Sequence, residues 1–192
     1  GVKKGLGFKY KYPKPTHGNS KGLLPFVTLQ EAIGDLEASP GPYFTGSYSS
    51  IYMSRNRKKR WDEQSFTIQA SGRQAPLHPS GAPMEKVDKD KWIFPDGEDA
   101  HRRLSVREIA RIQTFPDWFT FSDGGNMNVT ENNRLDKQYK QIGNAVPVLL
   151  AKAVADPIAK WAVEHLKNAT SMTPSNYSCF KHRLLLYPAL AR

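Results

Sequence analysis

Apolar residues recur every three or four positions after Pro147, which predicts an amphipathic helix that ends near Leu166. Pro147 suits the first turn of this helix, whereas Pro157 is expected to kink it. The apolar positions are Leu149, Leu150, Ala153, Val154, Ile158, Trp161 and Ala162. One face of the helix therefore needs a surface to cover it.

Two capping boxes predict the starts of two further helices. In each, a hydroxyl residue precedes a glutamate by three positions: Thr28 with Glu31, and Ser105 with Glu108. The first predicts a short helix, and the second predicts a helix that ends near Gln113.

The remaining patterns predict strands and loops. Aromatic and β-branched residues favour short strands at Tyr48–Met53 and Phe66–Gln69, and a further strand at Trp92–Phe94. Residues 122–137, which are rich in Gly and Asn, are expected to form a mobile loop. The fold class is therefore predicted as α+β, with a small, mostly-β domain that carries short helices.

Charge narrows the class of partner. The 192 residues include 28 Lys and Arg against 18 Asp and Glu, a formal charge of +10. Such a surplus favours nucleic acid as the partner, although a soluble basic domain without such a partner has the same composition. No apolar run approaches the roughly 20 residues of a membrane helix, so no membrane partner is expected.

Cysteine and histidine usage exclude two other classes of site. Cys179 is the only cysteine, so an intrachain disulfide is impossible and a reducing, cytoplasmic setting is expected. The five histidines are scattered without cysteine partners at zinc spacing, so no metal site is expected.

A basic run at residues 55–60 is the first candidate for DNA binding. In an extended chain, Arg55 and Arg57 point to one face, where their guanidinium groups suit the O6 and N7 atoms of guanine. Lys58, Lys59 and Arg60 are then expected to hold phosphates without reading sequence. The alternative is an ordinary solvated charge run.

Two more segments carry groups that suit DNA. A turn presents Arg73 and Gln74, which are further candidate base contacts, although a hairpin turn with polar tips explains them equally well. The helix that follows Ser105 exposes N-terminal amides beside Arg102 and Arg103, which predicts a phosphate site. The alternative there is a surface helix with one buried apolar face.

The segment before the long helix suits a small polar ligand. Gly143 permits a tight turn, Asn144 offers hydrogen bonds, and the small side chain of Ala145 lets a ligand approach closely. With Val146 and Pro147 it leads into the helix N-terminus. An amino-acid carboxylate or amine is the kind of group that fits.

Together these segments resemble one known family. Arg102–Asp117 is similar to motif nine of cytosine-5 DNA methyltransferases, and Gln138–Val148 is similar to motif ten. Residues 43–79 resemble the target-recognition region of bacterial members that methylate the inner cytosine of GGCC. Residues 8–17 look like the linker that leaves the catalytic domain.

The resemblance implies roles for several residues. It implies that Asn144, Ala145 and Val146 line the pocket for S-adenosylmethionine, in a Rossmann-like catalytic domain. It also implies base-reading roles for Arg55, Arg57 and Arg73. The reaction of the family flips the target cytosine out of double-stranded DNA.

The sequence departs from the family in what it lacks. The Pro-Cys nucleophile motif, the Phe-x-Gly-x-Gly cofactor loop, the Glu-Asn-Val acid and the Arg-x-Arg motif are all missing. No catalytic role passes to Cys179, because its surroundings do not match the nucleophile motif. No residue of this chain is therefore predicted to be catalytic.

The predicted organisation follows. Residues 1–20 form the linker, 21–130 the recognition domain with motif nine, 138–167 the motif-ten helix that docks on the missing domain, and 168–192 a tail. The chain is expected to be the DNA-recognition part of a methyltransferase that needs a catalytic chain carrying motifs one to eight. The alternative is a non-catalytic, sequence-specific DNA-binding module or remnant.

Overall fold

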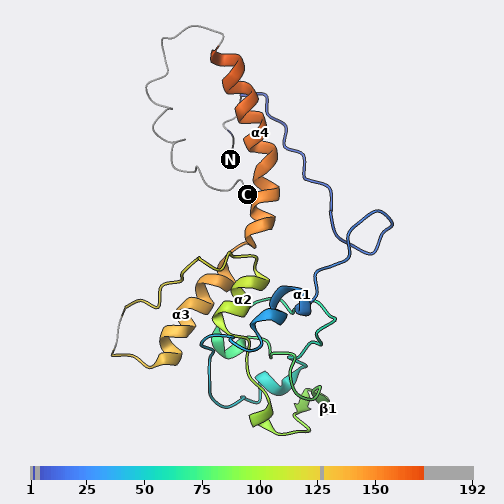
Figure 1. Cartoon of the computed structure of the whole chain (residues 1–192), viewed down its shortest axis with the longest axis vertical. Helices are drawn as coiled ribbons and strands as arrows, with labels where there is room; N and C mark the ends of the chain where they lie inside the picture. Colours follow the sequence, from blue (N-terminus) through green and yellow to red (C-terminus); the bar gives the residue numbers. More distant parts are fainter. Residues whose placement is uncertain (1, 3–4, 126–127, 171–192) are drawn as a thin grey trace. The chain divides into compact units, whose positions relative to one another are not determined.

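A computed structural model describes residues 2, 5–125 and 128–170 (Figure 1). These residues form two compact units, one from residues 14–151 and the other from the N-terminal segment to Pro13 with the chain from Lys152. The elements in order are α1 (Leu29–Ile33), η1 (Gly34–Leu36), η2 (Tyr52–Ser54), η3 (Gly72–Gln74), β1 (Glu85–Asp88), β2 (Lys91–Ile93), η4 (Glu98–Ala100), α2 (Val106–Ile112), α3 (Glu131–Asn144) and α4 (Val148–Thr170), where η marks a 3-10 helix.

Both capping boxes are confirmed. The Thr28 amide donates to Glu31 Oε2 at 2.8 Å, and Thr28 Oγ1 accepts from the Glu31 amide at 3.2 Å. Ser105 and Glu108 repeat this arrangement at the start of α2, at 2.7 and 3.1 Å. Each box satisfies amides that the first turn of a helix leaves without partners.

The mixed α+β class is confirmed, but the mostly-β content is wrong. The described residues hold one sheet, in which β1 pairs with β2 antiparallel, and β2 covers most of the strand expected at Trp92–Phe94. The strands expected at Tyr48–Met53 and Phe66–Gln69 are absent from this part of the chain. At the first of them, side chains occupy the backbone groups that a strand would pair: Ser49 Oγ accepts from the Tyr52 amide at 3.2 Å.

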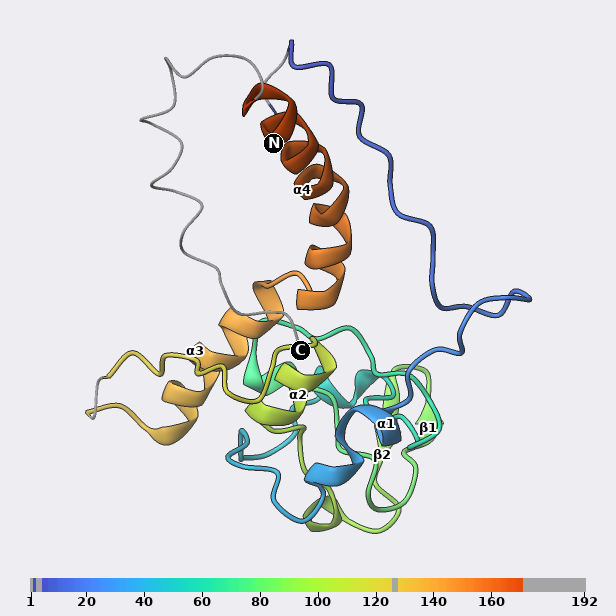
Figure 2. The ribbon, with the colours of Figure 1, turned by 45° about the horizontal axis from the view of Figure 1, so that its top comes forward.

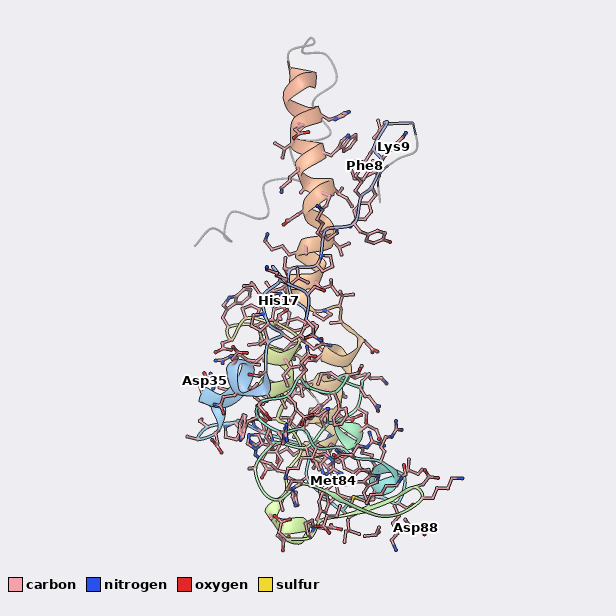
Figure 3. All side chains as sticks on the ribbon, turned by 90° about the vertical axis from the view of Figure 1, so that its right-hand side faces the viewer. Phe8, Lys9, His17, Asp35, Met84 and Asp88 are labelled. Atoms are coloured by element: carbon pink, nitrogen blue, oxygen red, sulfur yellow. The ribbon has the colours of Figure 1, made fainter. Side chains whose placement is uncertain are left out.

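The core of the larger unit lies among three helices. α2 packs against both α1 and α3, as Figure 2 shows. Ile33, Ile109, Tyr139 and Ile142 are fully buried there. A second, smaller cluster of Tyr52, Leu77 and Met84 lies beside the β1–β2 hairpin; Met84 is labelled in Figure 3.

Helix α3 replaces much of the loop expected at 122–137. It begins at Glu131, after Thr130 accepts a hydrogen bond from the Asn133 amide. Gly143 lies inside the last turn of α3, so the expected tight turn at Gly143 is also wrong. A Cβ atom at Gly143 would lie 2.5 Å from the backbone nitrogen of Ala70, so glycine is needed there for close packing and not for a turn.

The smaller unit pairs the N-terminal segment with α4. The rings of Phe8 and Trp161 lie 5.1 Å apart, and the Tyr10 hydroxyl donates to the carbonyl of Val154 at 2.9 Å. The helix predicted after Pro147 is confirmed, and it continues through Pro157 to Thr170. Residues 171–192, which include Cys179, lie outside the described residues.

Much of the apolar surface of α4 is exposed. Leu149 is 62% and Leu150 53% exposed. Residues Glu131–His165, which combine α3 and α4, are long and apolar enough to cross a membrane by length and composition. That test is weak support for a span, because core helices of soluble proteins also pass it.

Candidate nucleic-acid interface

A cleft of about 540 Å3 lies between the 44–51 loop and the η3 turn. Backbone and small polar groups of residues 44–49 form one wall, and Arg73 and Gln74 form the other. Arg103 and Asn132 complete the lining. The cleft therefore combines a cation, an amide and exposed backbone, which are groups that contact DNA.

The η3 turn presents Arg73. Its side chain is exposed and, within the described residues, makes no hydrogen bond or ion pair. Gly72 before it is buried against Phe44, and a Cβ there would lie 2.6 Å from that ring. The tight packing at Gly72 thus fixes the turn that carries Arg73.

Arg57 lies behind Gln74 and is only 5% exposed. Its Nη2 donates to Gln74 Oε1 at 2.9 Å, and its Nε donates to the Tyr52 carbonyl at 3.1 Å. Its guanidinium group also lies over the Tyr52 ring, 4.7 Å from the centroid. Because Arg57 binds the amide oxygen of Gln74, the amide nitrogen of Gln74 points away from Arg57.

Arg55 is exposed at the end of η2, where the backbone is extended. Burial lowers the pKa of Arg57, and the nearby charge of Arg55 lowers it further. The two arginines are thus close enough to repel each other, although no strand places them on one face as expected. Among the described residues, the Arg55 side chain has no hydrogen-bond partner.

Lys58 does not occupy the exposed position that phosphate binding requires. It is 6% exposed, and its Nζ donates to the carbonyls of Ser80 and Ala82 and to His101 Nδ1, the last at 2.8 Å. His101 Nε2 in turn donates to Asp96 Oδ1 at 2.6 Å. Lys58 therefore ties the 80–82 loop to His101, which follows η4, and its ammonium group is used inside the fold and not held free for phosphate.

Lys59 and Arg60 lie on the surface beside a second cleft of about 550 Å3. Lys59 pairs with Glu63 at 2.9 Å, and Arg60 pairs with Asp62 at 3.1 Å. The Arg60 side chain is 70% exposed. Both cations are accessible, and exposed pairs of this kind exchange partners at little cost.

Arg103 is also a structural residue in this fold. It is 3% exposed, and its guanidinium donates to the carbonyls of Gly46 at 3.0 Å and Ser47 at 3.2 Å. It also lies 4.4 Å from the centroid of Tyr48. These bonds hold the cleft wall from inside and occupy the guanidinium group that was predicted to contact phosphate.

Arg102 is engaged by a buried carboxylate. Its two terminal nitrogens each donate to Glu108 at 2.8 Å, and the Glu108 side chain is fully buried. The N-terminus of α2 is buried too, with Ser105 at 0% exposure and its hydroxyl bonded to the Pro40 carbonyl. The groups that the predicted phosphate site would use are therefore already engaged within the fold.

His78 extends the same buried cluster. Its Nε2 lies 3.6 Å from Glu108 Oε1, while Nδ1 accepts from the Ser80 amide at 3.2 Å. Burial, with the positive charge of Arg102, lowers the pKa of His78 to about 4. Near neutral pH the ring is uncharged, and this corner of the fold carries no free cation for DNA.

Asn144, Ala145 and Val146 connect α3 to α4. Asn144 is exposed, Val146 is 59% exposed, and the Ala145 amide caps α3 by donating to the Ile142 carbonyl at 3.1 Å. Among the described residues the Asn144 side chain has no partner. An accessible amide beside two small apolar groups fits one wall of a cofactor pocket.

Sequence patterns missed the residues that hold the cleft together. Asn132, Asp136 and Tyr139 lie on α3, and each bonds to a wall of the cleft. The first two fall in the segment 122–137 that was expected to be a loop, and Tyr139 falls in the motif-ten segment that follows it. Their spacing of four and then three residues was the available signal, because it places all three on one helix face.

Comparisons with known proteins identify the family. Residues 26–160 match the model of the family described as C-5 cytosine-specific DNA methylase. The Type II methyltransferase M.BsuRI of Bacillus subtilis is 73% identical over 169 residues, which are 88% of this chain and 39% of that protein. M.BspRI of Lysinibacillus sphaericus is 73% identical over 168 residues, 88% of this chain and 40% of that protein.

A third relative is more distant. The Type II methyltransferase M.MthTI of Methanothermobacter thermautotrophicus is 46% identical over 178 residues, covering 83% of this chain and 49% of the relative. The chain thus spans about 40% of the length of its two relatives at 73% identity.

The three relatives named above are Type II methyltransferases, so the chain is related to methyltransferases. More specifically, the chain belongs to the C-5 cytosine-specific DNA methylase family, whose model matches most of its length.

Proposed function

We propose that this chain is the DNA-recognition part of a cytosine-5 DNA methyltransferase, and that it methylates cytosine only together with a chain or segment that carries motifs one to eight. The observation that carries the proposal is the cleft whose wall exposes Arg73 and the amide of Gln74. We infer a GGCC-like target in double-stranded DNA, because residues 43–79 resemble the recognition region of enzymes with that target.

The base contacts that we propose come from the lining of this cleft and from the exposed end of η2. Arg55 and Arg73 each offer a guanidinium fork to guanine, worth roughly 1–3 kcal/mol of discrimination. Gln74 offers its amide nitrogen, and the buried Arg57 supports Gln74 through the bond from Nη2. Arg60 and Lys59 are the proposed phosphate contacts, because both are accessible.

S-adenosylmethionine is the cofactor that the family implies. Its sulfonium group supplies an electrophilic methyl group for C5 of the target cytosine. In this chain Asn144 would donate or accept hydrogen bonds at the polar edge of the cofactor, and Ala145 and Val146 would contact its apolar edge. The nucleophilic thiolate must come from the part that carries the Pro-Cys motif.

The exposed apolar residues of α4 support a partner surface in that catalytic part. Leu149 and Leu150 are both more than half exposed, and an apolar helix face of this kind marks an interaction site. We place the whole enzyme in the cytoplasm, with DNA as its substrate.

Methyl transfer by a reconstituted enzyme tests the proposal. The chain is mixed with the part of the Bacillus subtilis relative that carries the Pro-Cys motif, and incorporation of labelled methyl from S-adenosylmethionine into a GGCC duplex is measured. Transfer is expected only with both parts present, and it should fall when one base of the site is changed.

Two further outcomes distinguish the proposed methyltransferase part from a non-catalytic DNA-binding module. Cys179→Ser is expected to leave the reconstituted activity unchanged, and loss of activity would contradict the proposed division of labour. Site-preferring DNA binding without any methyl transfer or complex would instead identify a non-catalytic DNA-binding module.

A further inference from the structure

Four residues form a stripe along α3 toward the DNA cleft. Asn132, Asp136, Tyr139 and Gly143 are separated by four, three and four positions, which places them on one face of the helix. Each contacts a segment that lines or adjoins the cleft. The stripe therefore links parts of the chain that are far apart in sequence.

Asn132 holds the first wall. Its Oδ1 accepts from the Thr45 amide at 3.0 Å, and its Nδ2 donates to the Thr45 carbonyl at 2.9 Å. This side chain satisfies both backbone groups of one residue, as a neighbouring strand would. The 44–51 loop, which lacks strand pairing among the described residues, is thereby fixed at Thr45.

Asp136 holds the second wall. Its Oδ1 accepts from the Gly72 amide at 2.7 Å and from the Ser71 hydroxyl at 3.2 Å. Arg73 and Gln74 follow immediately. A charged acceptor makes stronger hydrogen bonds than a neutral one, so the carboxylate fixes the start of the η3 turn.

The two remaining residues set the depth of the packing. The Tyr139 hydroxyl accepts from the Phe44 amide at 3.2 Å and donates to the Leu104 carbonyl at 2.6 Å. Gly143 admits the Gln69–Ala70 backbone against the helix. Both walls are therefore anchored to one rigid element, and the distance between them depends on α3.

We propose that Asn132 and Asp136 are positioning residues for DNA-site discrimination, which set the width of the cleft and hence the position of Arg73 and Gln74 against the base edges. The inference rests on the proposed function and deepens it. Recognition of base edges needs side chains held within about 0.5 Å, which hydrogen bonds to the supporting backbone provide.

The test measures binding and turnover by the complete enzyme, formed from this chain and its catalytic part. The dissociation constant for a duplex with one base of the site changed is divided by the dissociation constant for a GGCC duplex, and this ratio measures discrimination. Asn132→Ala and Asp136→Ala should each lower this ratio roughly fivefold to tenfold, the loss expected for one or two net hydrogen bonds. KM for the GGCC duplex should rise while kcat at saturating DNA stays unchanged.

Two matched variants control the result. Asn133→Ala removes an exposed asparagine from the adjacent position of α3, and it should leave the ratio unchanged. Asp136→Asn keeps an oxygen that accepts from the Gly72 amide, so it should retain most of the discrimination. If Asn132→Ala does not fold, Asn132→Asp, which keeps only the acceptor for Thr45, carries the same expectation.

Several outcomes would overturn the inference. Equal weakening on both duplexes, or a lower melting temperature with an unchanged ratio, would make the two residues merely structural. A parent enzyme without site preference would overturn the proposed function and this inference together. A discriminating parent whose Asn132 and Asp136 variants discriminate equally well would overturn the inference alone.

Discussion

The Nη2 atom of Arg57 donates to Oε1 of Gln74 at 2.9 Å, across 17 residues of sequence. The bond fixes which end of the Gln74 amide faces the cleft, because the oxygen is held by the arginine. Gln74 therefore presents its amide nitrogen, a donor that suits the O6 or N7 atom of a purine. Arg57 thus reaches the proposed DNA interface partly through another side chain.

Single and double substitutions of this pair test the relationship in the complete enzyme. Arg57→Ala should weaken binding of the GGCC duplex by about 1–3 kcal/mol and change binding to random DNA little. Gln74→Ala should cause a similar loss, and the double variant should lose less than the sum of the two, because the residues act as one unit. The measurement is a double-mutant cycle of duplex affinities.

Additive losses would show that Arg57 and Gln74 contact DNA independently. Arg60→Ala serves as the comparison on the same basic run, because its side chain is 70% exposed and pairs only with the surface carboxylates of Asp62 and Glu63 among the described residues. It should weaken both duplexes equally and reduce the salt slope of binding by about 0.9, the value for one phosphate contact.

Arg102→Ala should destabilise the fold. The substitution leaves the fully buried carboxylate of Glu108 without its cation, which costs about 3–5 kcal/mol. The free energy of unfolding, measured by denaturant titration, should fall by that amount. Arg60→Ala, which breaks an exposed pair, should change it by less than about 1 kcal/mol. A stable Arg102→Ala variant with a reduced salt slope would restore the phosphate role.

Gly143→Ala should also destabilise the fold. The added Cβ would meet the backbone of Gln69 and Ala70 at 2.5 Å, and overpacking of this kind typically costs about 1–3 kcal/mol. Gly34→Ala is the matched control, since its Cβ would meet only the movable end of the Gln30 side chain. Thermal melts of the two variants should therefore separate clearly; equal melting temperatures would contradict the packing argument.

The buried His78 should make stability fall at acid pH. Its pKa is lowered to about 4 by burial and then by Arg102, with a smaller contribution from Lys58, while Glu108 acts in the opposite direction. The unfolded chain takes up this proton near pH 6.5, whereas the folded protein resists until about pH 4. The stabilisation is therefore complete above about pH 6.5 and is lost as the pH falls toward 4.

Denaturant titrations between pH 7 and pH 4 measure this loss. His78→Gln should make the free energy of unfolding less dependent on pH between pH 7 and pH 4, because glutamine does not titrate. His17→Gln is the control, since His17 is exposed, and it should leave the dependence intact. An unchanged slope in His78→Gln would assign the loss to other groups.

Local patterns predicted the helix starts and part of the site. The Thr28 and Ser105 capping boxes depend only on residues three positions apart, and α4 depends on a simple period, so these signals survive in any tertiary context. The strand expected at Tyr48–Met53 failed because its evidence was composition alone. Two of its backbone groups bond to nearby side chains and not to a neighbouring strand: the Tyr52 amide donates to Ser49 Oγ, and the Tyr52 carbonyl accepts from Arg57 Nε.

Residue type also could not distinguish cations that are free to contact DNA bases from cations that stabilise the fold. Arg55, Arg57 and Lys58 are adjacent in sequence, yet Arg55 is exposed while Arg57 and Lys58 are buried among carbonyl oxygens. The acceptors that bury Lys58 belong to residues 80–82 and to His101. The six residues of the basic run at 55–60 do not specify partners that lie more than twenty positions away in sequence.

By itself the sequence determined the family resemblance, the excess of positive charge, the capped helix starts and the period of α4, since each depends on residue identity and short spacing. The tertiary structure alone decided which cations remain free and which stabilise the fold. It also decided that α3 holds both walls of the cleft. These outcomes depend on hydrogen bonds between distant segments, such as Asn132 to Thr45, whose geometry exists only once the core has packed.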